Sequence, residues 1–112
     1  MYNLEQVLRG INLYLESEFL AKMNGWQKWL IGAGFGIAMN NANQIFNEVK
    51  NYPVVKMLNL VDDNDNINVE ALHEELLKQA RKSAVTFSLP TIGNVTLNES
   101  DVQKLYNCII GS

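Results

Sequence analysis

The spacing of apolar residues changes near residue 84, and this change constrains the fold more than any other feature of the sequence. Before it, apolar residues recur every three or four positions, which is typical of helices that bury one face. After it, Val85, Phe87 and Leu89 alternate with polar residues, the two-residue period of a half-buried strand. The pattern predicts an α+β fold that is mainly helical. The 112 residues suffice for a single domain, 1–112.

The N-terminal third of the chain predicts a helical hairpin. Residues 3–23 carry an apolar stripe with helical spacing, formed by Leu4, Val7, Leu8, Ile11, Leu15, Phe19 and Met23. Asn24 and Gly25 predict the end of this helix, because glycine readily adopts the left-handed conformation found just past a helix. A second helix is expected to start near Trp26 and to run to about Val49.

The first half of this second helix is apolar on all sides, which predicts that it is buried. The apolar run from Trp29 to Met39 is far shorter than the roughly 20 residues that span a bilayer, so we expect no membrane insertion. Gly32 and Gly36 share one helical face and would let another backbone approach closely. That neighbour is either the first helix of the same chain or a helix of another subunit.

Two tryptophans precede this glycine-rich region. Trp26 and Trp29 are three residues apart and so neighbours on a helix, where they would pack in the core or anchor a partner protein. Together with Gly32 and Gly36 they form the candidate helix–helix interface of the sequence.

The middle of the chain contains a break, a short apolar segment and a third helix. Asn51-Tyr52-Pro53 interrupts the helical pattern, since the residue before proline disfavours helical backbone. Residues 54–61 fit a helical turn or a buried strand, and their spacing decides for neither. After a polar loop at 62–66, Asn68 predicts the N-cap of a helix that runs to about Lys82. Within it, Glu74 and Lys78 are expected to pair.

The last third predicts an antiparallel β-hairpin and a C-terminal helix. The two strands lie within 84–97, with Pro90-Thr91-Ile92-Gly93 as the turn. Asn98 is expected to cap the final helix, and acidic residues follow in its first turn. The buried stripe of that helix should comprise Val102, Leu105, Tyr106 and Ile109.

Charge and cysteine content exclude some classes of function. The net charge of −3 argues against sequence-independent binding of nucleic acid, which requires a cationic surface. Residues 1–20 lack a basic start followed by a continuous apolar stretch, so we expect no secretory signal. The single cysteine, Cys108, cannot form an internal disulfide, which fits the reducing environment of the cytoplasm. We expect it to be a buried structural thiol.

The acidic segment 62–70 resembles a calcium-binding loop in part. Oxygen-bearing side chains fall at alternate positions from Asp62, as in an EF-hand. The glycine required at the sixth position is replaced by Ile67, and the bidentate glutamate at the twelfth position by His73. A solvated acidic turn that leads into a capped helix explains the same residues, although weak binding of a divalent ion stays open.

Two further patterns lack essential residues. His73-Glu74 resembles the start of a zinc-protease helix, but the second histidine four residues later is replaced by Leu77. The glycines at 32–36 are predicted to lie inside a helix, whereas a nucleotide-binding loop lies between a strand and a helix. We therefore expect neither a metal nor a cofactor, and interpret His73 as a surface or boundary residue.

The C-terminal quarter resembles a group of phage proteins. The run from Val85 to Gly93, followed by Leu97-Asn98-Glu99-Ser100-Asp101-Val102, is similar to small uncharacterised proteins carried by prophages of low-GC Gram-positive bacteria. This resemblance implies a phage accessory or virion-assembly protein, and it transfers no functional residues.

The sequence favours a non-enzymatic protein that binds other proteins or assembles with itself. No nucleophile is paired with a base, and no acid–base pair has the spacing that catalysis requires, which argues against an enzyme. The most favoured form is a homo-oligomer. The alternative is a small regulatory adaptor that binds a partner protein through its helical face.

Overall fold

The computed structural model describes residues 1–19, 35–89 and 93–111. It confirms the predicted α+β class, mainly helical, with a β-hairpin and a C-terminal helix. The elements in chain order are α1 (Leu4–Phe19), α3 (Phe35–Lys50), α4 (Pro53–Met57), α5 (Val69–Lys82), β1 (Val85–Leu89), β2 (Gly93–Leu97) and α6 (Glu99–Ile110).

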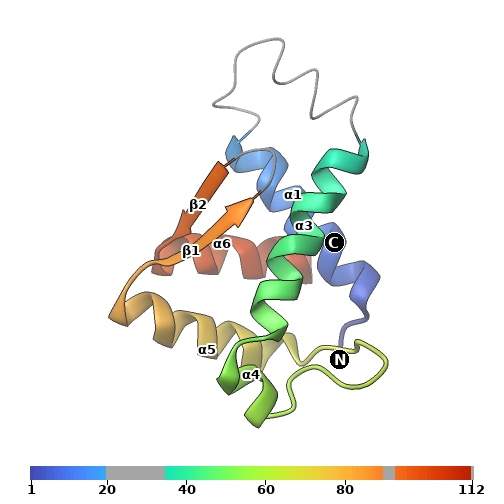
Figure 1. Cartoon of the computed structure of the whole chain (residues 1–112), viewed down its shortest axis with the longest axis vertical. Helices are drawn as coiled ribbons and strands as arrows, with labels where there is room; N and C mark the ends of the chain where they lie inside the picture. The colour runs from blue at the N-terminus through green and yellow to red at the C-terminus, as the bar shows by residue number, and fades with distance from the viewer. Residues whose placement is uncertain (20–34, 90–92, 112) are drawn as a thin grey trace.

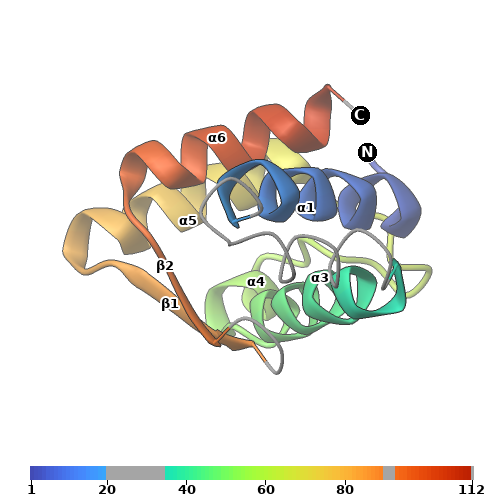
Figure 2. The ribbon, with the colours of Figure 1, turned by 90° about the horizontal axis from the view of Figure 1, so that it is seen from above.

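The N-terminal helix α1 is the centre of the arrangement. It packs against α3 on one side and against α6 on the other, and α5 lies beside α6 (Figures 1 and 2). The α1 and α3 helices confirm the described parts of the two predicted N-terminal helices. Of the four candidate interface residues, Trp26, Trp29 and Gly32 lie outside the described residues, and Gly36 falls in the first turn of α3.

The hairpin follows the predicted alternation. β1 pairs with β2 in antiparallel register, with Phe87 opposite Val95 and Val85 opposite Leu97. Val85, Phe87 and Leu89 are buried, whereas Thr86 and Ser88 are exposed. The exposed face carries its own polar contacts, including a hydrogen bond of 3.2 Å between the Thr86 and Thr96 hydroxyls. Residues 90–92 of the predicted turn lie outside the described residues.

Both predicted N-caps are confirmed. The Asn68 side chain accepts a hydrogen bond from the Ala71 amide at 3.2 Å, at the start of α5. At the start of α6, Asn98 and Asp101 form a reciprocal capping box, in which each side chain accepts a hydrogen bond from the other's backbone amide. These contacts satisfy amides that a helix start leaves without an intrahelical partner.

The prediction that Lys78 pairs with Glu74 within α5 was wrong. Lys78 contacts Glu75 at 3.3 Å, one helical turn away at i,i+3, where we predicted Glu74. The Glu75 side chain is largely covered, whereas Glu74 lies on the exposed part of the helix. Both spacings bring side chains onto neighbouring positions of a helix surface, so sequence spacing alone does not choose between them.

Residues 54–61, for which the sequence allowed either a helical turn or a buried strand, begin as a helix. Pro53 occupies the first turn of α4, where its missing amide leaves no hydrogen bond unmade. After α4, Asn59 adopts a positive φ of 51°, and the chain then returns to form an isolated bridge between Val61 and Ile67. Only Val55 and Leu60 of this segment are buried, so it is neither a buried strand nor a buried helix.

A single glycine determines how closely α1 and α6 approach. A Cβ atom added to Gly10 would overlap the Ile109 Cα and would lie 2.8 Å from the Ile109 amide nitrogen. Side chains essentially never reach such a distance to a neighbouring backbone, so the helix pair is in contact through main-chain atoms at this point. Gly10 therefore has the close-packing role that the sequence suggested for Gly32 and Gly36.

Candidate functional site

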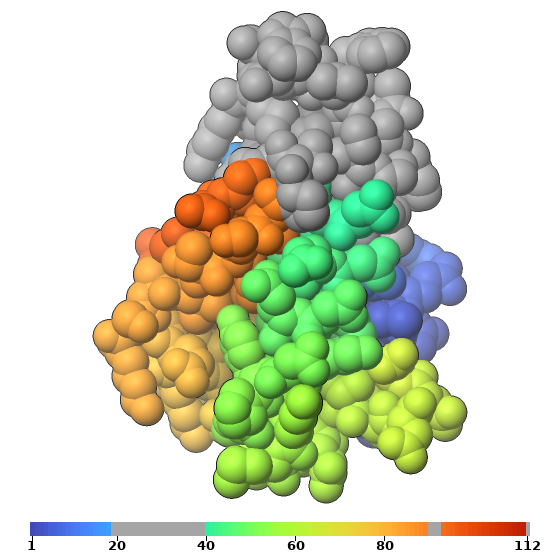
Figure 3. Space-filling model, in the orientation of Figure 1, coloured from blue at the N-terminus to red at the C-terminus, as the bar shows by residue number. Residues whose placement is uncertain are grey.

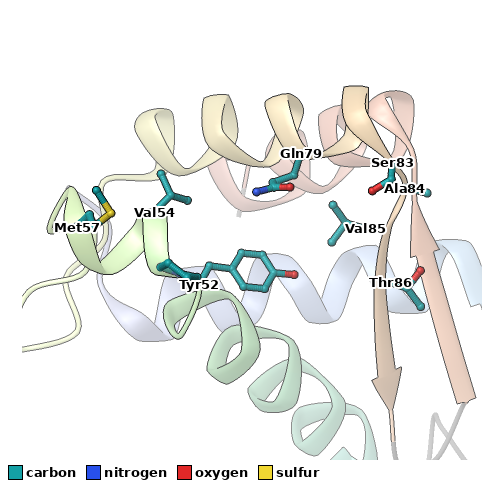
Figure 4. A pocket seen from close by; sticks show the side chains of 9 residues that line it. Tyr52, Val54, Met57, Gln79, Ser83, Ala84, Val85 and Thr86 are labelled. Carbon is teal, nitrogen blue, oxygen red and sulfur yellow. The ribbon is translucent and has the colours of Figure 1, made fainter.

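An open groove of about 420 Å³ lies among the described residues. In Figure 3, α4 and the end of α3 lie beside the end of α5 and the start of β1 on the face shown. The groove runs between these elements, and Figure 4 shows its lining side chains. Those lining residues are Tyr52, Pro53, Val54, Met57, Gln79, Ser83, Ala84, Val85 and Thr86.

Tyr52 is in the groove because the chain changes direction there. Its backbone is extended, as expected for a residue that precedes proline, and its amide donates to the Val49 carbonyl at 3.1 Å. The ring extends from the start of α4 across the groove toward Val85 (Figure 4). Burial, together with the negative charge of Glu48, raises the pKa of Tyr52 above its ordinary value. The phenol therefore stays neutral at physiological pH.

The α4 side of the groove is strongly apolar and exposed. Val54 and Met57 line it, and the Met57 side chain is 79% exposed. The next residue, Leu58, is 53% exposed. Exposed methionines and leucines that adjoin an apolar hollow are typical of surfaces that bind other proteins.

The opposite side of the groove supplies polar groups without an ionisable pair. Gln79 at the end of α5 and Ser83 beside it face the groove, and Thr86 follows on β1 (Figure 4). Among the described lining residues, Tyr52 is the only one with a titratable side chain. The groove can therefore enclose an apolar side chain and donate hydrogen bonds, but its lining offers no paired acid and base.

Lysine side chains occur on two of the helices that border the groove. Lys56 is on α4, next to Met57, and Lys82 is in the last turn of α5, next to Ser83. Within the described parts of the chain, neither lysine takes part in an ion pair. Arg81 in the same turn is paired with Glu99 at 3.3 Å, and both side chains are more than half exposed. Lys56 and Lys82 thus adjoin lining residues in the chain, whereas the negative charge of Glu48 acts on Tyr52 at another part of the groove.

The acidic loop at 62–66 is organised around one carboxylate. Asp62 Oδ1 accepts hydrogen bonds from the amides of Asn64 at 2.8 Å and Asn66 at 2.9 Å, and Oδ2 accepts one from the Asn66 side chain. These hydrogen bonds, led by the Asn66 amide, lower the pKa of Asp62. In the described part of the chain, no three acidic, histidine or cysteine side chains converge as metal ligands do.

We predict that this loop binds calcium no more tightly than about millimolar, the weak end of the range for such loops. Binding there would have to break the hydrogen bonds that Asp62 accepts within the loop, and the glycine and terminal glutamate of a calcium loop are absent. Isothermal titration of the protein with CaCl₂ tests this prediction, with Asp62→Asn as the control. A micromolar site that Asp62→Asn removes would contradict it.

His73 is a boundary residue that packs against the last helix. Its ring stacks on Tyr106 of α6, with a centroid separation of 4.1 Å and an interplanar angle of 18°. Both rings border a cavity of only about 20 Å³ between α5 and α6, whose other walls are aliphatic. The stacking gives His73 a packing role between the two helices, consistent with the interpretation from the sequence.

Cys108 is less buried than expected. Its side chain is half-buried on α6, and burial together with the Glu18 carboxylate raises the pKa of the thiol. Glu18 is itself paired with Lys104 at 3.6 Å, across the contact between α1 and α6. A raised pKa lowers the thiolate fraction at neutral pH, so this environment suppresses nucleophilic reactivity.

The groove was not predicted from the sequence, which indicated a contact at Trp26, Trp29, Gly32 and Gly36. None of the helices in the described ranges has the length and hydrophobicity to cross a membrane. Comparisons of this chain with protein-family models, with curated proteins and with solved structures found no match.

Proposed function

We propose that this chain is a non-enzymatic assembly protein that associates with itself through the face that carries the groove. The observation that carries the proposal is the exposed apolar surface of Met57 and Leu58 at the groove. Such a surface is costly in water, and its burial against another protein stabilises a complex. An assembly role of this kind agrees with the phage accessory or virion-assembly function that the C-terminal resemblance implies.

The chemistry of the groove supports binding over catalysis. Its lining combines aliphatic and thioether groups with a neutral phenol, an amide and hydroxyl groups. Tyrosine and methionine are enriched at the centres of protein interfaces, and methionine adapts its shape to the surface it meets. These groups hold an apolar side chain in place without moving a proton.

Sedimentation of the unmodified protein tests self-association. We expect the mass to rise from monomer to dimer as the concentration increases from about 1 to 100 μM, the range in which contacts of moderate affinity form. A protein that stays monomeric throughout this range would contradict the assembly proposal and would favour the adaptor. Genes for tail or capsid proteins next to the coding gene would support the phage context, and their absence would count against it.

A further inference from the structure

We propose that two copies of this chain make a reciprocal contact, in which Met57 and Leu58 of each copy enter the groove of the other. This inference rests on the proposed self-association and specifies its surface. The same α4 helix contributes a wall of the groove and the side chains that would fill a second groove. A surface that carries both parts is complementary to itself, which is the requirement for a two-fold interface.

The charges near these residues are also complementary between two copies of the chain. Lys56 precedes Met57 and Lys82 precedes Ser83, so a lysine adjoins each of these two lining residues in the chain. The loop that follows Leu58 is acidic, with Asp63 exposed and without an ion pair in the described part of the chain. A copy that inserts Met57 and Leu58 therefore carries Asp63 five residues after Leu58. We pair that carboxylate with Lys82 of the groove it enters.

The hydrogen bonds within the acidic loop make Asp63 the better choice for this pairing. Asp62 directs its carboxylate into the loop and accepts three hydrogen bonds there. Its closed conformation leaves Asp63 as an exposed carboxylate on a fixed turn rather than on a loose segment. A charge on a fixed turn loses less conformational entropy when it pairs than one on a long flexible segment.

Replacement of Met57 by aspartate tests the apolar part of the contact. Met57→Asp should weaken dimerisation at least about ten-fold, because a charge would have to enter an apolar groove. Circular dichroism should be unchanged, since the side chain is 79% exposed. The matched control is Leu13→Asp on α1, which also places aspartate at an exposed leucine but away from the groove. This control should sediment as the unmodified protein does.

A charge exchange tests the pairing of Asp63 with Lys82 and does not depend on the apolar residues. Asp63→Lys and Lys82→Glu should each weaken dimerisation about three- to ten-fold, because a two-fold contact contains the pair twice. The double variant should restore the affinity of the unmodified protein, since it reverses both charges. The same exchange at Glu5 and Arg9, an exposed pair on α1, is the control and should have no effect.

The outcomes separate the two proposals. A monomeric unmodified protein overturns the proposed function. A dimer that withstands Met57→Asp overturns only the reciprocal contact, and self-association then uses another surface. A double charge variant that is weaker than both single variants likewise overturns the pairing of Asp63 with Lys82, whereas recovery of affinity in that variant supports the contact as described.

Discussion

Phe87→Ala is expected to lower the free energy of unfolding by about 3–5 kcal/mol, the usual cost of removing a buried phenylalanine. The Phe87 side chain is 1% exposed and lies on the face of β1 that covers the helices. The substitution removes that burial and leaves a cavity that the short sheet cannot fill. The loss would be a large share of the stability of a small domain.

Urea unfolding followed by circular dichroism measures this effect. Thr86→Val is the matched control, because Thr86 is the preceding residue on the exposed face of the same strand and valine keeps its shape. The control loses the exposed hydrogen bond between the Thr86 and Thr96 hydroxyls and should change the free energy of unfolding by no more than about 1 kcal/mol. Equal stability of Phe87→Ala and Thr86→Val would mean that the hairpin does not cover the core.

Gly10→Leu should destabilise the protein by about 3 kcal/mol, at the upper end of the range for overpacked cores. The added side chain would meet the backbone of Ile109, and a helix backbone cannot move aside as a flexible side chain can. To accommodate leucine, α6 would have to separate from α1 and give up contacts along both helices. Leucine itself favours helix over glycine, so intrinsic propensity acts in the opposite direction.

The control for Gly10 is Arg9→Leu, which adds leucine at the neighbouring, exposed position of α1. It removes only the exposed pair between Arg9 and Glu5 and should cost no more than about 0.5 kcal/mol. Thermal unfolding of the two variants gives the comparison. A Gly10→Leu protein as stable as the original would show that α1 and α6 are not in backbone contact.

The elements best predicted from the sequence are those with a local signal. Two helices, α5 after Asn68 and α6 after Asn98, show this best. Each has an N-cap, an apolar stripe and a clear end within about 15 residues. The hairpin alternates strictly, and a shift of register by one residue would expose Phe87. The short α4 has five residues, too few for a period to emerge, and so its type stayed open.

The groove and the Gly10 contact could not be predicted because their partners are distant in sequence. Gly10 meets Ile109, and no pattern within α1 indicates what crosses it. The cluster of glycines at 32–36 was more conspicuous than one glycine inside an amphipathic helix. The groove combines Tyr52, which the sequence marked only as a helix break, with Gln79 and Val85 from later elements. Met57 and Leu58 belonged to an apolar run, which does not reveal which of its members are exposed.

The contact between α1 and α6 has a consequence for the synthesis of this protein. The ribosome makes α1 before α6, at about 5–20 residues per second. The face of α1 at Gly10 therefore has no cover for about 5–20 s, until Ile109 has been added. During that interval the nascent chain exposes apolar surface that the finished fold buries. Native packing of α1 thus waits for α6, and chains that stop before α6 would expose this face to chaperones and proteases.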